Sequence, residues 1–414
     1  MRLLVLTHTF PPSRHANAKR PGYLVRSLLE AGWQVDVFTT SIGVPADEAE
    51  SLTHAGLRIV RSSLHAERWL AKCSGHKRLY RAVGLFLAGT SWPDICYKWV
   101  LEAMSESRKL GPYDRVLAFV MPASMLLTGL YRRGVGRCWT FDYQESLSPH
   151  LRQHARRSPL QRAMRPALER LERHTLHKAG QVVFTAETNR RAYVEGGLVP
   201  ESSTHHVPYF FDTEQFNTPA PSRSPDFEVV YFGTFDWRGA RSPETFLRSL
   251  ALFLKSNPAA RPRTRFSFYG NWLHEHDAFV SDLGLQDVVS INSSVPYSEY
   301  IEKVRSSPVL LLVVAAAHNL FMPSKIVDYF GAKRPILAFV PKKSEMAGVL
   351  NQAGMGEYAC EEFDAEGGCR ALRELWSRYS CGRLEVDSSK ACFWSSKVQV
   401  ERYVKLLGAI PEVV

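Results

Sequence analysis

The amino-acid sequence predicts an α/β protein built from two Rossmann-like βαβ domains that face each other across a cleft. Short apolar runs alternate with segments of helical periodicity along most of the 414 residues, which predicts parallel sheets covered by helices. The alternation stops at residues 213–226, which are rich in Pro, Ser and Thr, and it restarts afterwards. We therefore expect an N-terminal domain over residues 1–212, a linker over 213–226 and a C-terminal domain over 227–392.

The first half begins with a complete strand–loop–helix–strand unit. The apolar run Leu3–Leu6 predicts a buried strand, and apolar residues at three- and four-residue spacing predict a helix over residues 21–33. Alternating residues over 34–40 predict the next strand. Later apolar runs predict parallel strands at residues 115–120, 138–142 and 181–186.

The second half repeats the pattern. Residues 228–235 predict a strand, and the helix after it has Ser242 as a suitable N-cap with Pro243 at the first helical position. Further strands are expected at residues 264–271, 288–294 and 308–317 and from Ile336, with helices over 275–285, from Pro323 and over 395–407.

The positive charge is confined to the first half. Residues 1–212 hold 29 Lys and Arg against 18 Asp and Glu, whereas the remaining 23 basic and 23 acidic residues cancel. Two segments, Arg61–Trp92 and His150–Lys178, concentrate this charge, and the first interleaves it with aromatic residues and an apolar patch. Such segments suit the surface of an anionic membrane. The alternative is a pair of ordinary surface helices.

Several functional classes lack support in the sequence. No stretch has the length and apolar character of a membrane-spanning helix, and the N-terminus lacks the apolar core of a signal peptide. The seven cysteines form no CxxC pair, which favours reduced thiols and a cytoplasmic protein. Neither a GxGxxG fingerprint, a P-loop, a nucleic-acid-binding motif nor an Asp-x-Asp metal motif is present, so we expect no metal and no cofactor.

Four polar loops follow predicted strands, where open α/β sheets bind their ligands. These loops are His8–Arg20, Asp142–Ser148, Gly233–Ser242 and His318–Lys325. Two lie in each half, so a cleft between the domains would collect all four.

The last two of these loops carry the features of a phosphate site. Gly233 allows close backbone approach, while Arg238 and Arg241 precede a helix whose N-terminus favours anions. Ser324 and Lys325 open another helix in the same way, and Asp328 lies one turn further on the same face. A carboxylate there suits the vicinal hydroxyls of ribose. Together these residues predict a nucleoside-diphosphate site, the alternative for the first loop being flexible chain with surface arginines.

With these motifs in view, the chain resembles the family-4 (retaining) type of GT-B glycosyltransferases over nearly its whole length. The similarity is carried by residues 1–40, by "CWTFDYQESLSP" (138–149), by residues 170–194, by "VVYFGTFDWRGARSPETFLRSL" (229–250) and by "PSKIVDYFGAKRPILAFV" (323–340). Departures from the family pattern are Ala16-Asn17 for a Gly-Gly pair, Gln144-Glu145 for Arg-Asp, and Leu320 near the first position of a Glu-x7-Glu pair whose second position is Asp328.

The resemblance implies a donor site in the C-terminal domain and an acceptor site in the N-terminal one. As catalytic residues that neutralise the leaving diphosphate it suggests Arg238, Arg241 and Lys325, and as donor-binding residues Gly233, Ser324 and Asp328. On the acceptor side it suggests His15, Asn17, Arg20, Asp142 and Glu145, with a purely structural role as the alternative for Asp142. It also implies that a C-terminal helix within residues 393–414 crosses back to the N-terminal domain.

The expected activity is transfer of a sugar from a nucleotide-diphosphate sugar to a lipid-linked or cell-envelope glycan. The expected partners are the nucleotide sugar, a glycan or polyprenyl-linked acceptor and the cytosolic face of an anionic membrane, with no nucleic acid. Two alternatives stay open. A nucleotide-sugar epimerase of the same fold would need no acceptor side, and a non-catalytic relative would retain the fold without the chemistry.

Overall fold

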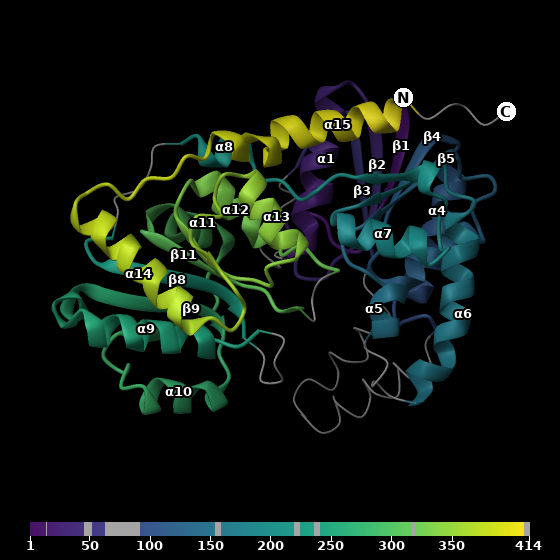
Figure 1. Ribbon diagram of the computed structural model, residues 1–414. Helices are drawn as coiled ribbons and strands as arrows, with labels where there is room; N and C mark the ends of the chain where they lie inside the picture. Colours follow the sequence, from purple (N-terminus) through teal and green to yellow (C-terminus); the bar gives the residue numbers. More distant parts are fainter. Residues whose placement is uncertain are drawn as a thin grey trace, which may run out of the picture. The chain divides into compact units, whose positions relative to one another are not determined.

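The computed structural model describes residues 1–13, 15–44, 52–62, 92–153, 159–218, 224–235, 241–316 and 320–409. The chain divides into two compact units, and each contains one parallel sheet with helices packed on it (Figure 1). The first unit is Met1–Pro208 together with Val400–Val414, and the second is Tyr209–Gln399.

The first unit contains a seven-stranded sheet of order β3-β2-β1-β4-β5-β6-β7. Its strands are β1 (Arg2–Leu6), β2 (Gln34–Thr40), β3 (Leu57–Ser62), β4 (Tyr113–Phe119), β5 (Gly136–Tyr143), β6 (Gln181–Phe184) and β7 (Thr204–His206). All neighbours pair in parallel, with Leu3 opposite both Val35 and Arg115. The central strands are buried over almost their whole length because both faces of a parallel sheet are covered.

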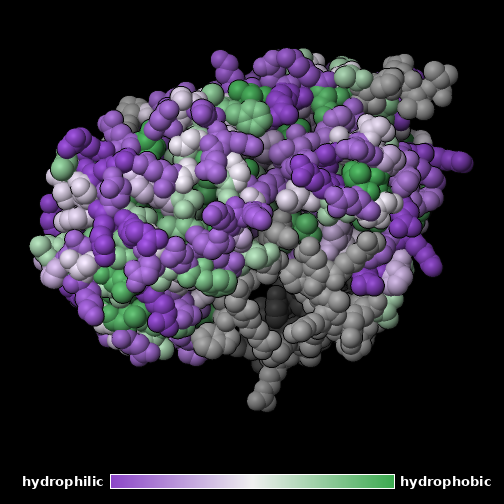
Figure 2. Space-filling view, in the orientation of Figure 1, coloured by the Kyte–Doolittle hydropathy of each residue, from purple (hydrophilic) through white to green (hydrophobic). Residues whose placement is uncertain are grey.

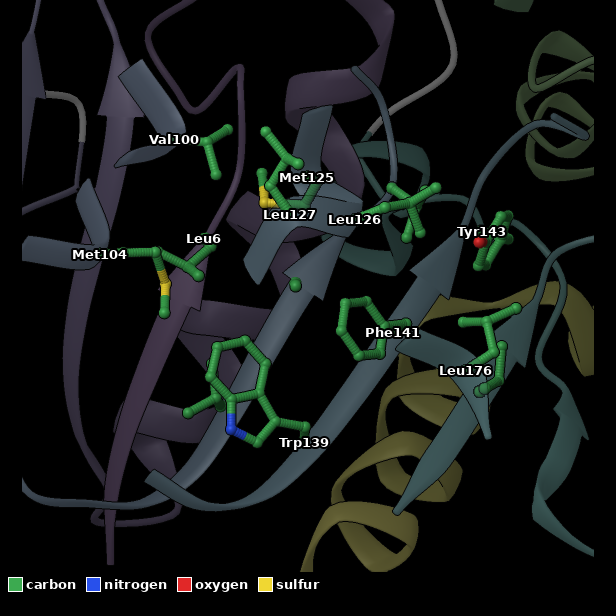
Figure 3. Packing of buried hydrophobic residues seen from close by; sticks show 14 of the residues in the cluster. Leu6, Val100, Met104, Met125, Leu126, Leu127, Trp139, Phe141, Tyr143 and Leu176 are labelled. Atoms are coloured by element: carbon green, nitrogen blue, oxygen red, sulfur yellow. The ribbon is translucent and has the colours of Figure 1, made fainter. Parts of the chain in front are cut away.

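The helices of this unit bury apolar stripes against the sheet. They are α1 (Lys19–Glu30), α4 (Tyr97–Leu110), α5 (Ser148–Gln153), α6 (Pro159–Leu176) and α7 (Glu187–Glu195), with the 3-10 helices η1 (Ala16–Ala18), η2 (Ala123–Gly129) and η3 (Glu201–Ser203). Figure 3 shows how side chains from β1, α4, η2 and β5 converge in the core, among them Leu6, Met104, Met125 and Trp139.

The second unit contains a six-stranded parallel sheet of order β10-β9-β8-β11-β12-β13. Its strands are β8 (Phe227–Thr234), β9 (Thr264–Asn271), β10 (Val289–Asn292), β11 (Val309–Val313), β12 (Ile336–Phe339) and β13 (Ala359–Cys360). Its helices are α8 (Thr213–Phe216), α9 (Glu244–Ser256), α10 (Asp277–Asp282), α11 (Tyr297–Ser306), α12 (Lys325–Ala332), α13 (Glu345–Gln352) and α14 (Ala365–Ser380), with 3-10 helices η4 (Pro258–Arg263), η5 (His274–His276) and η7 (Ser389–Trp394). The last helix, α15 (Ser396–Gly408), begins in this unit and continues into the first.

Both sheets reverse their strand order once. In the first unit the reversal separates β1 from β4, and in the second it separates β8 from β11. The helices that follow the two strands leave toward opposite faces, so a crevice opens beside the carboxyl ends of the strands at this point. The residues that follow β1, β4, β8 and β11 are therefore the first place to look for a site.

The central strands lie where the sequence predicts them, but three edge strands were not predicted. β3 is only half-buried along its length, β7 has three residues and β13 has two. Such short or half-exposed strands lack the apolar run that makes a central strand recognisable.

The boundary between the units lies earlier than the expected boundary at Asp212. Phe211 belongs to the second unit, where its N–H donates to the carbonyl of Trp394 (3.0 Å) and its carbonyl accepts from the N–H of Ser396 (2.8 Å). The crossing helix begins at Ser396, and its residues from Val400 belong to the first unit. These backbone bonds explain why residues 209–212 group with the second unit.

Arg20 and Asp142, expected on the acceptor side, lie in a closed polar cluster inside the first unit. Nε and Nη2 of Arg20 donate to Oδ2 of Asp142 at 3.0 and 2.9 Å, and Nη1 donates to the carbonyl of Pro208 at 2.8 Å. The hydroxyl of Tyr403 on α15 donates to the same carboxylate oxygen at 2.8 Å. Both charged side chains are at most 2% exposed, so they are structural residues that tie α15 to α1 and β5.

No helix among the residues the structure describes is long and apolar enough to cross a membrane. On the face seen in Figure 2, hydrophilic residues predominate and apolar residues form small separate patches. None of the six described cysteines forms a disulfide.

Replacement of Arg20 by Met is expected to lower the free energy of unfolding by about 3–5 kcal/mol, because it leaves the Asp142 carboxylate buried without its counterion. The double variant Arg20→Met, Asp142→Leu is expected to be more stable than the single variant, since no buried charge remains. Arg26→Met, on the exposed face of α1, is the matched control and should change stability by less than about 0.5 kcal/mol. Denaturant unfolding of the four proteins tests this, and a single variant as stable as the control would contradict it.

Candidate functional site

The carboxyl end of β8 carries a glycine in a backbone conformation that other residues rarely adopt. Gly233 has a φ of 133° and its partner on β9, Gly270, has a φ of 144°, a region that strongly favours glycine. A Cβ atom on Gly270 would lie 1.9 Å from the carbonyl oxygen of Gly233. The two strand ends therefore approach as closely as backbone allows, and nothing larger than glycine fits at Gly270.

Lys325 extends from the first position of α12 across this strand end. Its ammonium donates a hydrogen bond to the carbonyl of Phe232 at 2.8 Å and lies 3.7 Å from the ring centroid of Tyr231. A Cβ atom built on Gly233 would be 3.5 Å from the same Nζ. Within the described part of the chain, no carboxylate forms an ion pair with Lys325. The contacts of the amine with described residues are thus a neutral carbonyl and an aromatic face.

A second cation acts on Lys325. Burial, and then the positive charge of Arg241 just before α9, hold the pKa of Lys325 well below its ordinary value. Two like charges close together in a partly desolvated position repel each other, and an anion between them would relieve the repulsion. A phosphate group is one anion that could fill this role.

The start of α12 adds a hydroxyl and a carboxylate. Ser324 is the residue before the helix, and its side chain makes no capping hydrogen bond. Asp328 lies in the first turn, is only 5% exposed, and accepts a hydrogen bond from the hydroxyl of Tyr300 at 3.0 Å. Lys325 therefore lies against Gly233 and near the charge of Arg241, and Ser324 and Asp328 lie at the start of the same helix. Arg238 and the residues 317–319 lie outside the described residues.

In the first unit, the loops after β1 and β5 lie together. The amide of Gln144 donates to the carbonyl of Asn17 at 3.5 Å. His15 is exposed, and its ring packs against Gly43, where a Cβ atom would come within 2.6 Å of Cδ2. Of the five residues expected on the acceptor side, His15, Asn17 and Glu145 lie in these loops, whereas Arg20 and Asp142 are buried beneath them.

Among the residues expected on the acceptor side, Glu145 has a carboxylate that no described residue binds. It follows β5, is half-buried, and forms no hydrogen bond or ion pair in the described structure. Burial raises the pKa of its carboxyl group. A carboxyl group that is partly desolvated and not engaged elsewhere can accept a hydrogen bond from a substrate hydroxyl.

His8 belongs to the same edge of the sheet but was not among the predicted site residues. It follows β1 directly, and its Nε2 lies 3.6 Å from Sγ of Cys96. Burial, and then the charge of His15, lower the pKa of His8 to about 4, so its imidazole is neutral at physiological pH. Its position immediately after a buried strand was the one signal in the sequence, but a single histidine in a polar loop is not distinctive.

A buried network braces the loop that carries Glu145. The hydroxyls of Tyr143 and Tyr193 both donate to Oε1 of Glu172, at 2.8 and 2.6 Å. The hydroxyl of Tyr193 also accepts from the N–H of Leu147 at 3.1 Å, which fixes the loop two residues after Glu145. Burial raises the pKa of Glu172 despite these hydrogen bonds.

The two basic segments expected to meet a membrane are only partly described. Residues 63–91 of the first and 154–158 of the second lie outside the described residues. Among the remaining residues, no group of three or more His, Cys, Asp or Glu side chains could hold a metal ion.

Neither a protein-family model nor a curated protein sequence matches the chain, but solved structures do. Sucrose-phosphate synthase from Thermosynechococcus elongatus matches with a TM-score of 0.64 and 14% identity over 98% of each chain. The structure "Trehalose-6-phosphate from E. coli bound with UDP-2-fluoro glucose" matches with a TM-score of 0.64 and 13% identity over 100% of each chain. WaaG, a glycosyltransferase involved in lipopolysaccharide biosynthesis, matches with a TM-score of 0.61 and 13% identity over 98% of this chain and all of that one.

These similarities show that the chain has the GT-B fold of these glycosyltransferases, which confirms the predicted fold class. The match extends over essentially the whole length of both chains, so both Rossmann-like sheets are included in it.

Replacement of Glu172 by Gln is expected to flatten the pH dependence of stability. Because the folded-state pKa of Glu172 is raised above its unfolded value, its contribution is fully present below the unfolded pKa and is lost as pH rises through the folded pKa. Glutamine cannot ionise, so the variant should lose less unfolding free energy than the wild type as the pH rises from below the unfolded pKa to neutrality. Denaturant unfolding across this range measures the difference, and parallel curves for the two proteins would contradict the assignment.

Proposed function

We propose that this protein is a glycosyltransferase that moves a sugar from a nucleotide-diphosphate sugar to a lipid-linked or cell-envelope glycan, with retention of configuration and without a metal ion. The observation that carries the proposal is Lys325, whose ammonium group reaches the end of β8 at the strand reversal of the second unit and feels the positive charge of Arg241. Asp328 lies in the first turn of the same helix. In a GT-B fold, this combination suits a diphosphate and a ribose.

The chemical step is the exchange of one bond at the anomeric carbon. The bond from that carbon to the diphosphate breaks, and a bond to the acceptor hydroxyl oxygen forms on the same face. The proton of the acceptor hydroxyl passes to the departing diphosphate oxygen, so no separate base is needed. Negative charge that develops on the diphosphate is stabilised by Lys325 and Arg241, and we assign Arg238 to the same role.

The remaining donor contacts follow from the local backbone. Gly233 presents main chain without a Cβ atom, and the N-terminus of α12 favours a phosphate oxygen. The hydroxyl of Ser324 adds a donor, and Asp328 accepts from the ribose hydroxyls. The E. coli neighbour is bound with UDP-2-fluoro glucose, which supports a uridine nucleotide as the first donor to test.

We assign Glu145, His15 and Asn17 to the acceptor. The carboxyl group of Glu145 would accept a hydrogen bond from a sugar hydroxyl, and the neutral imidazole of His8 lies on the same sheet edge. An envelope glycan as acceptor is supported by the similarity to WaaG, which is involved in lipopolysaccharide biosynthesis. The excess positive charge of residues 1–212 supports docking to the cytosolic face of an anionic membrane.

Nucleotide binding provides the direct test. The unfolding temperature is measured with UDP, GDP, ADP, CMP and NAD, and one nucleoside diphosphate is expected to stabilise the protein, by about 2.7 kcal/mol at a concentration 100 times its dissociation constant. Lys325→Met should weaken that nucleotide about 10- to 100-fold, because a charge-assisted phosphate contact is lost. Lys255→Met, on the exposed face of α9, is the matched control. Stabilisation by NAD alone, or an unchanged affinity in Lys325→Met, would contradict the proposed donor site.

Membrane docking is tested separately by sedimentation with vesicles. We expect binding to vesicles that contain an anionic phospholipid and none to neutral phosphatidylcholine vesicles. The variant Arg78→Gln, Arg81→Gln should bind the anionic vesicles roughly 30-fold more weakly, since each basic residue contributes about 1 kcal/mol. Arg261→Gln, Arg265→Gln in the second unit is the control. Equal binding of both variants would exclude the Arg61–Trp92 segment as the docking surface.

A further inference from the structure

Tyr300 is a hydrogen-bond partner of the carboxylate assigned to the ribose. It lies in the first turn of α11, and its hydroxyl donates to Oδ2 of Asp328 in the first turn of α12 at 3.0 Å. No motif in the sequence pointed to it, because it is one of sixteen tyrosines and lies 28 residues before Asp328.

Two aromatic neighbours fix the ring of Tyr300. The ring of Phe232 meets it edge to face with 4.8 Å between centroids, and the ring of Tyr297 stacks on it at 5.7 Å. Phe232 is itself stacked on Tyr269 of β9 at 5.2 Å. Aromatic packing of this kind leaves a side chain few rotamers, so the phenol oxygen has a defined position. The direction of the hydrogen bond from Tyr300 to Asp328 therefore depends on the packing of Tyr300 against Phe232 of the sheet.

Phe232 connects this arrangement to the phosphate side of the site. Its carbonyl oxygen accepts from Lys325, while its ring packs on Tyr300. A single buried residue at the end of β8 thus positions the ammonium assigned to the diphosphate and the phenol that holds the carboxylate. The distance between the group assigned to the diphosphate and the group assigned to the ribose therefore depends on Phe232.

We propose that Tyr300 is a positioning residue that makes the donor site selective for nucleotides with intact ribose hydroxyls. A carboxylate can accept about four hydrogen bonds, and Tyr300 uses one of them while it fixes the plane of the group. The vicinal hydroxyls of ribose are suited to donate to further acceptor positions of this carboxylate. A nucleotide that lacks the 2′-hydroxyl leaves a desolvated acceptor without its donor, which is the strongest basis for discrimination in a polar site.

The phenol keeps this role over a wide pH range. Burial, and then the charge of Asp328, raise the pKa of Tyr300 well above its ordinary value, so the hydroxyl remains a donor. Tyr329 and Tyr297 act on the pKa of Tyr300 in the same direction. The cations nearby are Lys325 and Arg241 on the phosphate side, and Lys303, which lies over the ring of Tyr269 at 4.8 Å.

The inference rests on the proposed function and is tested by comparing each ribonucleoside diphosphate with its 2′-deoxy counterpart. For the base that the wild type binds most tightly, calorimetry should show a preference for ribose of about 10- to 100-fold. Tyr300→Phe should reduce this ratio about 3- to 10-fold, mainly by weakening the ribonucleotide, and Asp328→Asn should remove most of it. A merely structural role would weaken both nucleotides equally and leave the ratio unchanged.

Tyr297→Phe is the matched control, because it removes a hydroxyl from the same helix that donates to Gln215 at 3.1 Å rather than to Asp328. It should keep the wild-type ratio. A ratio in Tyr300→Phe equal to that of the wild type would overturn the inference and leave the proposed function intact. Equal binding of the ribonucleotide and the 2′-deoxyribonucleotide by the wild type would also overturn the inference and leave the proposed function intact. A wild type that binds no nucleoside diphosphate would overturn both.

Discussion

The hydrogen bond from Lys325 to the carbonyl of Phe232 is the interaction on which the candidate site depends. It joins the first residue of α12 to the end of β8, the two elements that flank the strand reversal of the second sheet. Without it, the ammonium has no hydrogen bond within the described structure and is left with the aromatic face of Tyr231. The ring of Phe232 also packs on Tyr300, which donates to Asp328. The positions of Lys325 and Asp328 therefore both depend on Phe232.

Burial and the charge of Arg241 disfavour the charged form of Lys325, which is consistent with the proposed anion site. Lys325 is desolvated beside Arg241, a combination that the fold alone gains little from. The first unit shows the opposite case. Arg20 and Asp142 are also buried and charged, but they neutralise each other and are bonded to Tyr403 and to main-chain carbonyls. The charges of such a closed pair satisfy each other. Lys325, in contrast, has Arg241 as a neighbour and no carboxylate partner among the described residues, which favours an anion from outside.

Much of the fold and part of the site could be predicted from the sequence. The buried strands and the GT-B architecture follow from apolar runs and the polar loops after them, and Lys325, Arg241 and Asp328 lie in such loops or at the helix starts that follow them. Edge strands such as β7 were missed because they bury too little apolar surface to produce a pattern. Arg20 and Asp142 were assigned to a substrate because loop position alone does not distinguish an exposed charge from one that is closed in a pair.

The sequence by itself determined the central strands and several of the helices that follow them, because periodicity and capping are local properties. It also determined that positively charged residues and a carboxylate follow strands of the second half. Only the tertiary structure decided which charges face each other. Asp142 is closed by Arg20 from 122 residues away and by Tyr403 from 261 residues away, and Asp328 is held by Tyr300 from the neighbouring helix. Contacts at such separations arise from the packing of elements that the chain brings together only when it folds, and no local pattern encodes them.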